Sequence, residues 1–132
     1  MKTTQANTKK DLLLGAGLHV LHQESQEWLD TIAFWKDEIN FFSELLAKKE
    51  IKESDYGRIL KNLDKIHENL FDYLTQDIVK HEKFLSRLIK GESGISDENY
   101  REQHKKLHEQ MDLFSQNFKD FKMMVFGYAK KL

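Results

Sequence analysis

Between Tyr100 and Leu132, side chains on one helical face recur at alternating intervals of four and three residues without a break. The ten positions are Tyr100, His104, Leu107, Met111, Phe114, Phe118, Phe121, Val125, Tyr128 and Leu132. Because an α-helix has about 3.6 residues per turn, this spacing places all ten on the same side of a helix. Every position except His104 is apolar or aromatic. The pattern predicts a long amphipathic helix with a single polar side chain in its buried line of residues, which we call its seam.

Two earlier stretches have the same spacing and predict two further helices. Their seams are Leu14, Leu18, Leu21, Ser25, Trp28, Ile32, Trp35, Ile39, Phe42 and Leu46, and then Tyr56, Leu60, Leu63, His67, Leu70, Leu74, Asp77, His81, Phe84 and Leu88. Helix-capping residues stand at the expected ends: Thr8, Ser54 or Asp55, and Ser96 at N-termini, and Gly91 at a C-terminus. We therefore predict helices over residues of about 9–48, 55–90 and 97–131, preceded by a frayed tail at 1–7.

Short connections between consecutive helices make neighbouring helices antiparallel. The predicted fold is therefore all-α, a single domain over residues 1–132 in which three long helices form an antiparallel up-down-up bundle with coiled-coil-like heptad packing. The chain contains no proline, so no residue forces a kink or an early end in these helices.

Composition excludes several classes of function. The 21 basic and 22 acidic residues give a net charge of −1, which argues against nucleic-acid binding and against binding to an anionic membrane. No apolar run is long enough for a membrane span, and the polar N-terminus lacks the apolar core of a signal peptide, so we expect a cytoplasmic protein. The absence of cysteine excludes disulfides and thiolate metal sites. Nucleotide-binding glycine motifs, HExxH and a serine nucleophile elbow are also missing, so we assign no catalytic residues.

The first predicted helix has more apolar surface than one seam requires. Leu13, Val20, Phe34 and Phe41 lie seven or fourteen residues apart, on a stripe away from the seam. A stripe of this kind is typical of a surface that another helix covers. We expect that a second copy of the chain covers it, which predicts a homodimer.

Polar seam residues gather at one end of the predicted bundle. The expected register places Asp77 opposite Ser25, and His81 opposite both His22 and His108, with His104 one turn away. Asp77 and His81 are four residues apart, as are His104 and His108, so each pair projects from one face of its helix. Two such pairs on facing helices, with His22 beside them, are a candidate zinc or iron site formed by Asp77, His81, His104, His108 and His22.

A purely structural interpretation of these residues stays open. Asp77 and His81 can form a buried hydrogen-bonded pair that fixes the register of the bundle, as polar seam residues do in coiled coils. In that case His22 and His108 are solvated, and His67 is a core histidine with a local partner.

Two resemblances accompany this pattern. His81-Glu82 in an amphipathic helix, with His104 and His108 on the next, loosely resembles hemerythrin-like cation-binding bundles. Those have four helices and a fuller set of His, Glu and Asp ligands, whereas this chain has three predicted helices and no helical HxxxE pair. A fuller likeness is to small uncharacterised bacterial helical-bundle proteins. It covers most of the chain and implies no known activity. It includes the stretches Leu21-His22 to Glu27-Trp28-Leu29, Phe34 to Ile39, Asp77 to Glu82, and His104 with Leu107 and Met111. In that pattern the position of Ser25 is often histidine, so the resemblance implies one metal ligand fewer here.

Two hypotheses for function follow. The first is a non-enzymatic, intracellular interaction or structural module that self-associates. The alternative is a metal-binding bundle that holds zinc or iron in a layer of histidine and aspartate side chains.

Overall fold

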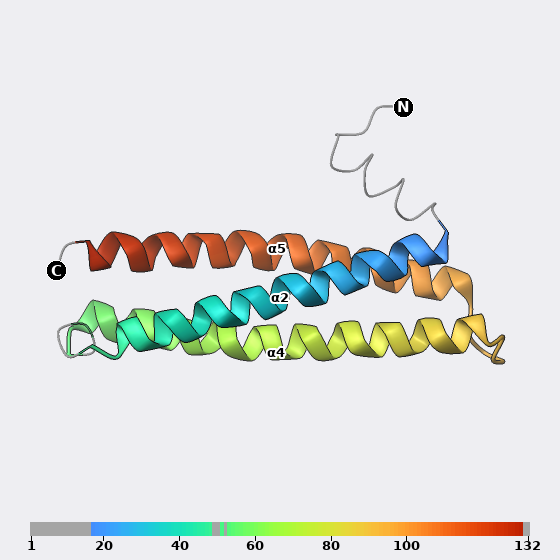
Figure 1. Cartoon of the computed structure of the whole chain (residues 1–132), viewed down its shortest axis with the longest axis horizontal. Helices are drawn as coiled ribbons and strands as arrows, with labels where there is room; N and C mark the ends of the chain where they lie inside the picture. Colours follow the sequence, from blue (N-terminus) through green and yellow to red (C-terminus); the bar gives the residue numbers. More distant parts are fainter. Residues whose placement is uncertain (1–16, 49–50, 52, 131–132) are drawn as a thin grey trace, which may run out of the picture.

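The computed structural model describes residues 17–48, 51 and 53–130. They form three α-helices, α2 (Leu18–Leu46), α4 (Asp55–Ile89) and α5 (Asp97–Ala129), which lie along one another with α2 crossing the other two at an angle (Figure 1). The predicted all-α, up-down-up bundle is confirmed. The predicted first turns from residue 9, the Thr8 cap and the tail at 1–7 lie outside the described residues.

The predicted capping residues explain where α4 and α5 begin and where α4 ends. Ser54 Oγ accepts a hydrogen bond from the Gly57 N–H at 2.9 Å, and Ser96 Oγ accepts one from the Asn99 N–H at 3.1 Å. Gly91 follows the last residues of α4 with a φ of 73°, the left-handed conformation that glycine adopts without strain. These three assignments from the sequence are confirmed.

Gly57 also sets how closely the α2–α4 connection packs on the first turn of α4. A Cβ atom at this position would lie 1.8 Å from the carbonyl oxygen of Ile51. Ile51 is itself buried in the core, so the connection can dock here only because residue 57 has no side chain.

The buried residues of α2 and α5 are those that the spacing predicts. In α2 they are Leu21, Ser25, Trp28, Ile32, Trp35, Ile39, Phe42 and Leu46, and in α5 they are Tyr100, His104, Leu107, Met111, Phe118, Phe121 and Val125. Every one of these is a predicted seam position. Aromatic rings from all three helices meet in the middle of the bundle, where Phe71 of α4 packs against Trp35 and Phe118. All three helices therefore contribute to the main core, and Leu21, Leu85 and Tyr100 form a smaller, separate buried cluster.

In α4, half of the predicted seam positions are wrong by one residue. The buried positions are Gly57, Leu60, Asp64, Phe71, Leu74, Ile78, His81 and Leu85. Leu60, Leu74 and His81 were predicted, but Leu70 and Asp77 are exposed and the next residues, Phe71 and Ile78, take their places. The physical reason is that α4 is apolar on two adjacent stripes, and both have the spacing of a buried seam.

Polar contacts hold the helices in register. The α2–α4 pair is joined along its length, from His22 with Glu82 to Ser43 Oγ, which donates to Asp64 Oδ2 at 2.5 Å. Direct contact between α2 and α5 is sparser. None of the helices in the described residues combines the length and apolarity that crossing a membrane requires.

Candidate functional site: a buried histidine layer and the pocket beside it

A chain of three polar side chains, one from each helix, crosses the bundle near the start of α2. His81 Nε2 of α4 lies 3.0 Å from His104 Nδ1 of α5, and His104 Nε2 lies 2.7 Å from Glu24 Oε1 of α2. Both histidines are buried. We call His81, His104 and Glu24 the histidine layer.

Aromatic rings hold the two imidazoles in place. The Tyr100 ring stacks on His81 with centroids 4.2 Å apart and an interplanar angle of 2°, and the Trp28 ring stacks on His104 at 4.5 Å. Both rings come from positions of the predicted seams, so the spacing that forms the core also sandwiches the layer. The imidazoles therefore have little freedom to turn away from each other.

Burial determines the charge of the layer. Loss of solvation, with a smaller contribution from the charge of His104, lowers the pKa of His81 from its ordinary 6.5 to about 4. His81 is thus neutral at physiological pH. Burial, reinforced by the carboxylate of Glu82, also raises the pKa of the Tyr100 hydroxyl, which stays protonated.

The hydrogen-bond geometry then assigns the protons. The Glu24 carboxylate can only accept, so His104 Nε2 carries a proton and donates it. When His104 is neutral, its other nitrogen, Nδ1, is an acceptor, and His81 Nε2 is the donor across the 3.0 Å contact. His81 Nδ1 is then a bare acceptor, buried and without a hydrogen-bond partner.

Several other buried polar atoms near this end of the bundle are poorly satisfied. Glu82 Oε1 lacks a hydrogen-bond partner, His108 Nδ1 lies 3.4 Å from Asp112 Oδ2, and Ser25 Oγ and Tyr100 OH interact with each other outside good hydrogen-bond geometry. Ser25 and Glu82 both act on the pKa of Tyr100, so these side chains lie near its hydroxyl. Unsatisfied buried polar groups are few in native proteins, and their concentration here distinguishes this end of the bundle from the aromatic core.

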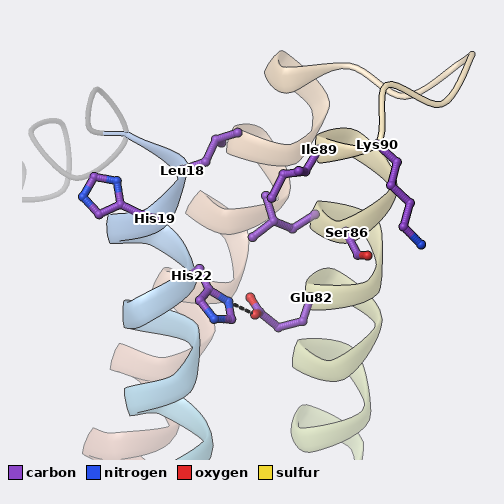
Figure 2. A pocket seen from close by; sticks show the side chains of 8 residues that line it. Leu18, His19, His22, Glu82, Ser86, Ile89 and Lys90 are labelled. Atoms are coloured by element: carbon purple, nitrogen blue, oxygen red, sulfur yellow. Dashed lines mark hydrogen bonds and ion pairs between the residues drawn. The ribbon is translucent and has the colours of Figure 1, made fainter.

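A pocket of about 390 Å³ lies beside the layer, between the first turns of α2 and the last turns of α4. Its lining includes apolar side chains of Leu18, Leu85 and Ile89. Figure 2 shows His22 of α2 and Glu82 of α4 pointing toward each other across the pocket, where they form an ion pair when His22 is protonated. Glu82 therefore joins the pocket to the buried polar atoms behind it.

The structure brings together only some of the predicted metal ligands. His81 and His104 are in direct contact, and His108 reaches the layer through Glu24, whose Oε2 lies 3.9 Å from His108 Nε2. His22 lies in the pocket with Glu82. Asp77 was predicted opposite Ser25, but it is exposed and lines a different pocket, which it shares with His81, Phe84 and Gln103.

No group of three or more His, Asp or Glu side chains is arranged to hold a metal ion within the described residues as they stand. Metal binding by Asp77, His81, His104, His108 and His22 stays a prediction.

Two site residues were missed from the sequence, and both are carboxylates one position off a seam. Glu24 precedes the buried Ser25, and Glu82 follows the buried His81. The signal was present, because an acidic residue at the edge of a seam can bend inward to a buried histidine on the facing helix. Neither carboxylate occupies a seam position, so the four-and-three spacing does not select it.

Comparisons of the chain with protein-family models, with curated proteins and with solved structures find no match. The likenesses to hemerythrin-like bundles and to small bacterial bundle proteins remain expectations from the sequence.

Proposed function

We propose that this protein is a self-associating helical-bundle interaction module. The observation that carries the proposal is an aromatic surface on the outside of the α2–α5 pair. Phe34 and Phe41 of α2 are 57% and 56% exposed, and Phe126 of α5 is 47% exposed. Large aromatic side chains at this exposure are typical of surfaces that become covered in an assembly.

These side chains form one surface. The Phe42 ring contacts both Phe41 and Phe126, with centroids 5.6 and 5.4 Å apart. Phe34 lies seven residues before Phe41, two turns away on the same face of α2. Of the other stripe residues predicted from the sequence, Val20 is half-buried and Leu13 lies outside the described residues. The proposal therefore rests on Phe34 and Phe41, extended by Phe126.

The charges of this surface suit a second copy of the chain. Glu38, which lies between Phe34 and Phe41 on the stripe, is bonded to Lys122 of α5 at 3.1 Å. The charge at the centre of the surface is thus balanced within one protomer, and the chain as a whole carries a net charge of only −1. Two copies can bring the same face together about a two-fold axis without strong repulsion.

The experiment is a change of oligomeric state. The double variant Phe34→Glu, Phe41→Glu places two charges on the surface, and we expect sedimentation velocity to show a smaller assembly than the wild type. Leu113→Glu is the matched control, because Leu113 of α5 is also 57% exposed but lies on another face. A monomeric wild type, or a double variant with the wild-type mass, overturns the proposal.

A second candidate function is binding of zinc or iron, and one observation favours it. His104 Nε2 and His108 Nε2 both lie near the Glu24 carboxylate, at 2.7 and 3.9 Å from its two oxygens. On their far sides, His104 Nδ1 is bonded to His81, and His108 Nδ1 lies 3.4 Å from Asp112 Oδ2. Metal-bound histidines have outer partners of this kind. An ion between these groups displaces the proton of His104 Nε2, so that His104 Nδ1 donates to His81 Nε2, and it replaces Asp77 with Glu24 as the carboxylate ligand.

A further inference from the structure

Helix α4 has a second apolar stripe beside its buried one. It consists of Ile59, Leu63, Ile66, Leu70 and Tyr73, at intervals of four and three residues. Leu63 packs at the edge of the core, but Ile59, Ile66 and Tyr73 are 56%, 46% and 68% exposed. The stripe is about 21 Å long at 1.5 Å per residue. Its regular spacing is that of a helix that packs against another helix.

The outer flank of this stripe is polar but uncharged. Asn62, Asn69 and Gln76 follow one another at intervals of seven residues, and all three are exposed. Together with the five apolar residues they make eight positions without a single charge, in a chain of which 33% is charged. The solvent-facing side of a surface helix ordinarily carries charged residues. This uncharged face of α4, defined by these eight residues, is therefore unlike a solvated surface.

We propose that the uncharged face of α4 binds the same face of a second copy of the chain, with the two α4 helices antiparallel about a two-fold axis near Ile66. Residues close to such an axis meet their own copies. A charged flank would bring like charges together, whereas asparagine and glutamine amides have both donors and acceptors and can bond to themselves. The amide flank is thus self-complementary, which is why we choose an identical chain as the occupant.

The proposed axis makes specific pairs. Ile66 packs against Ile66 of the second copy, and Ile59 packs against Tyr73 of the second copy, because the two positions lie seven residues on either side of Ile66. The interface rests on the proposed self-association and adds a contact that is independent of the Phe34–Phe41 surface, which lies on a different helix. Two different two-fold interfaces on one protomer assemble beyond a dimer.

The chain has no cysteine, so a single introduced thiol reports on one position alone. We expect Ile66→Cys to form a covalent dimer under mild oxidation. Lys61→Cys is the control, because Lys61 is exposed on the same helix but faces the side of Ser43 and Asp64. Proximity at the axis should make the Ile66→Cys reaction on the order of tenfold faster or more. A mixture of Asn62→Cys and Asn69→Cys, exposed positions that this axis places about level with each other, serves as the second probe should a cysteine at position 66 disturb folding.

A mixing experiment tests the orientation of the helices. Ile59→Cys and Tyr73→Cys proteins combined before oxidation should give mainly the mixed disulfide between the two variants. Disulfides formed only within each variant would indicate parallel helices and overturn the proposed axis. Equal cross-linking rates for Ile66→Cys and Lys61→Cys would overturn the interface itself.

The same probe separates this inference from the proposed function. Ile66→Cys is combined with Phe34→Glu and Phe41→Glu, and the α4 interface predicts that covalent dimers still form. Loss of the cross-link in that background would show that the α4 contact depends on the α2 surface, which overturns its independence. The cross-link could persist while the Phe34→Glu, Phe41→Glu variant keeps the mass of the wild-type assembly. That result supports the α4 interface and overturns the α2 surface.

Discussion

His81 Nε2 and His104 Nδ1 lie 3.0 Å apart and join α4 to α5 through a contact that has room for one proton. A proton added to His81 goes to its buried Nδ1, which has no hydrogen-bond partner, and places a charge in a desolvated site. Burial of His81 therefore makes the stability of this end of the bundle depend on pH.

We expect the free energy of unfolding to fall as the pH is lowered from 6.5 toward 4. The pKa of His81 is lowered to about 4 in the folded protein but is near 6.5 in the unfolded chain, so the unfolded chain binds more protons across this interval. The full contribution of neutral His81 is present above pH 6.5 and disappears by about pH 4. A shift of this size corresponds to about 3 kcal/mol. Urea denaturation at a series of pH values measures it, and a flat profile across the interval would contradict it.

His81→Gln should make this acid-dependent loss shallower. The glutamine amide can still donate to His104 Nδ1 but does not titrate, so the largest source of the pH dependence is removed. His19→Gln is the control, because His19 is exposed at the rim of the pocket. The control should keep the wild-type slope in the same urea titration. An unchanged slope in His81→Gln would show that another group is responsible.

Asp64 should act in the opposite direction. Burial raises its pKa despite the hydrogen bond from Ser43, so the folded protein holds its proton more tightly than the unfolded chain. Its contribution favours folding at low pH and is lost as the pH rises through the folded pKa. As the pH rises from acid to neutral, the wild type loses the free energy of unfolding that protonated Asp64 contributes. Asp64→Asn does not titrate at this position, so we expect it to lose less. The double variant with His81→Gln isolates the effect, and a difference of the opposite sign would refute it.

The metal hypothesis makes a prediction that distinguishes a site with Glu24 as its carboxylate ligand from a site with Asp77. Protein purified without an affinity tag should contain near-stoichiometric zinc or iron by elemental analysis, and a chelator should lower its melting temperature near neutral pH. Glu24→Gln should abolish both effects, whereas Asp77→Asn should leave them unchanged because Asp77 is exposed. Metal-free protein with an unchanged melting temperature would leave the histidine layer as a purely structural feature.

Gly57→Ala should destabilise the protein by about 1 to 3 kcal/mol, because the added methyl group collides with the Ile51 carbonyl oxygen. Gly127→Ala is the control, since a Cβ there meets no atom within 4 Å. In α5 that change should stabilise by up to about 1 kcal/mol, through helix propensity. Thermal or urea unfolding of the two variants measures both, and equal effects of the same sign would contradict the close packing at Gly57.

Spacing alone was enough to predict the bundle and the buried faces of α2 and α5, because each of these helices has one dominant apolar line. It failed in α4, where Leu63 and Leu70 compete with Asp64 and Phe71 for the buried side. Two stripes with the same period cannot be ranked by period. The facing helices decide between them, since Ser43 and Trp35 of α2 meet Asp64 and Phe71.

The candidate site was predictable in outline. His81 and His104 were predicted to lie about one turn apart, because both occupy seam positions near the same end of adjacent helices, and the structure brings them into direct contact. Glu24 could not be assigned in the same way, because its backbone position lies off the seam and only its side-chain conformation brings the carboxylate to His104. Asp77 was predicted in the core because the predicted seam of α4 was wrong by one residue there, and the structure places it at the surface.

The central position of α4 also bears on the order of folding. Helix α4 packs against both of its chain neighbours, whereas the first and last helices touch each other sparingly. Contacts between chain neighbours close short loops and form quickly, and contacts between distant segments form later. Either hairpin can therefore form first, and the bonds from Glu24 to His104 and from Glu38 to Lys122 complete the native state. Substitutions at these two pairs should accelerate unfolding and leave the refolding rate nearly unchanged.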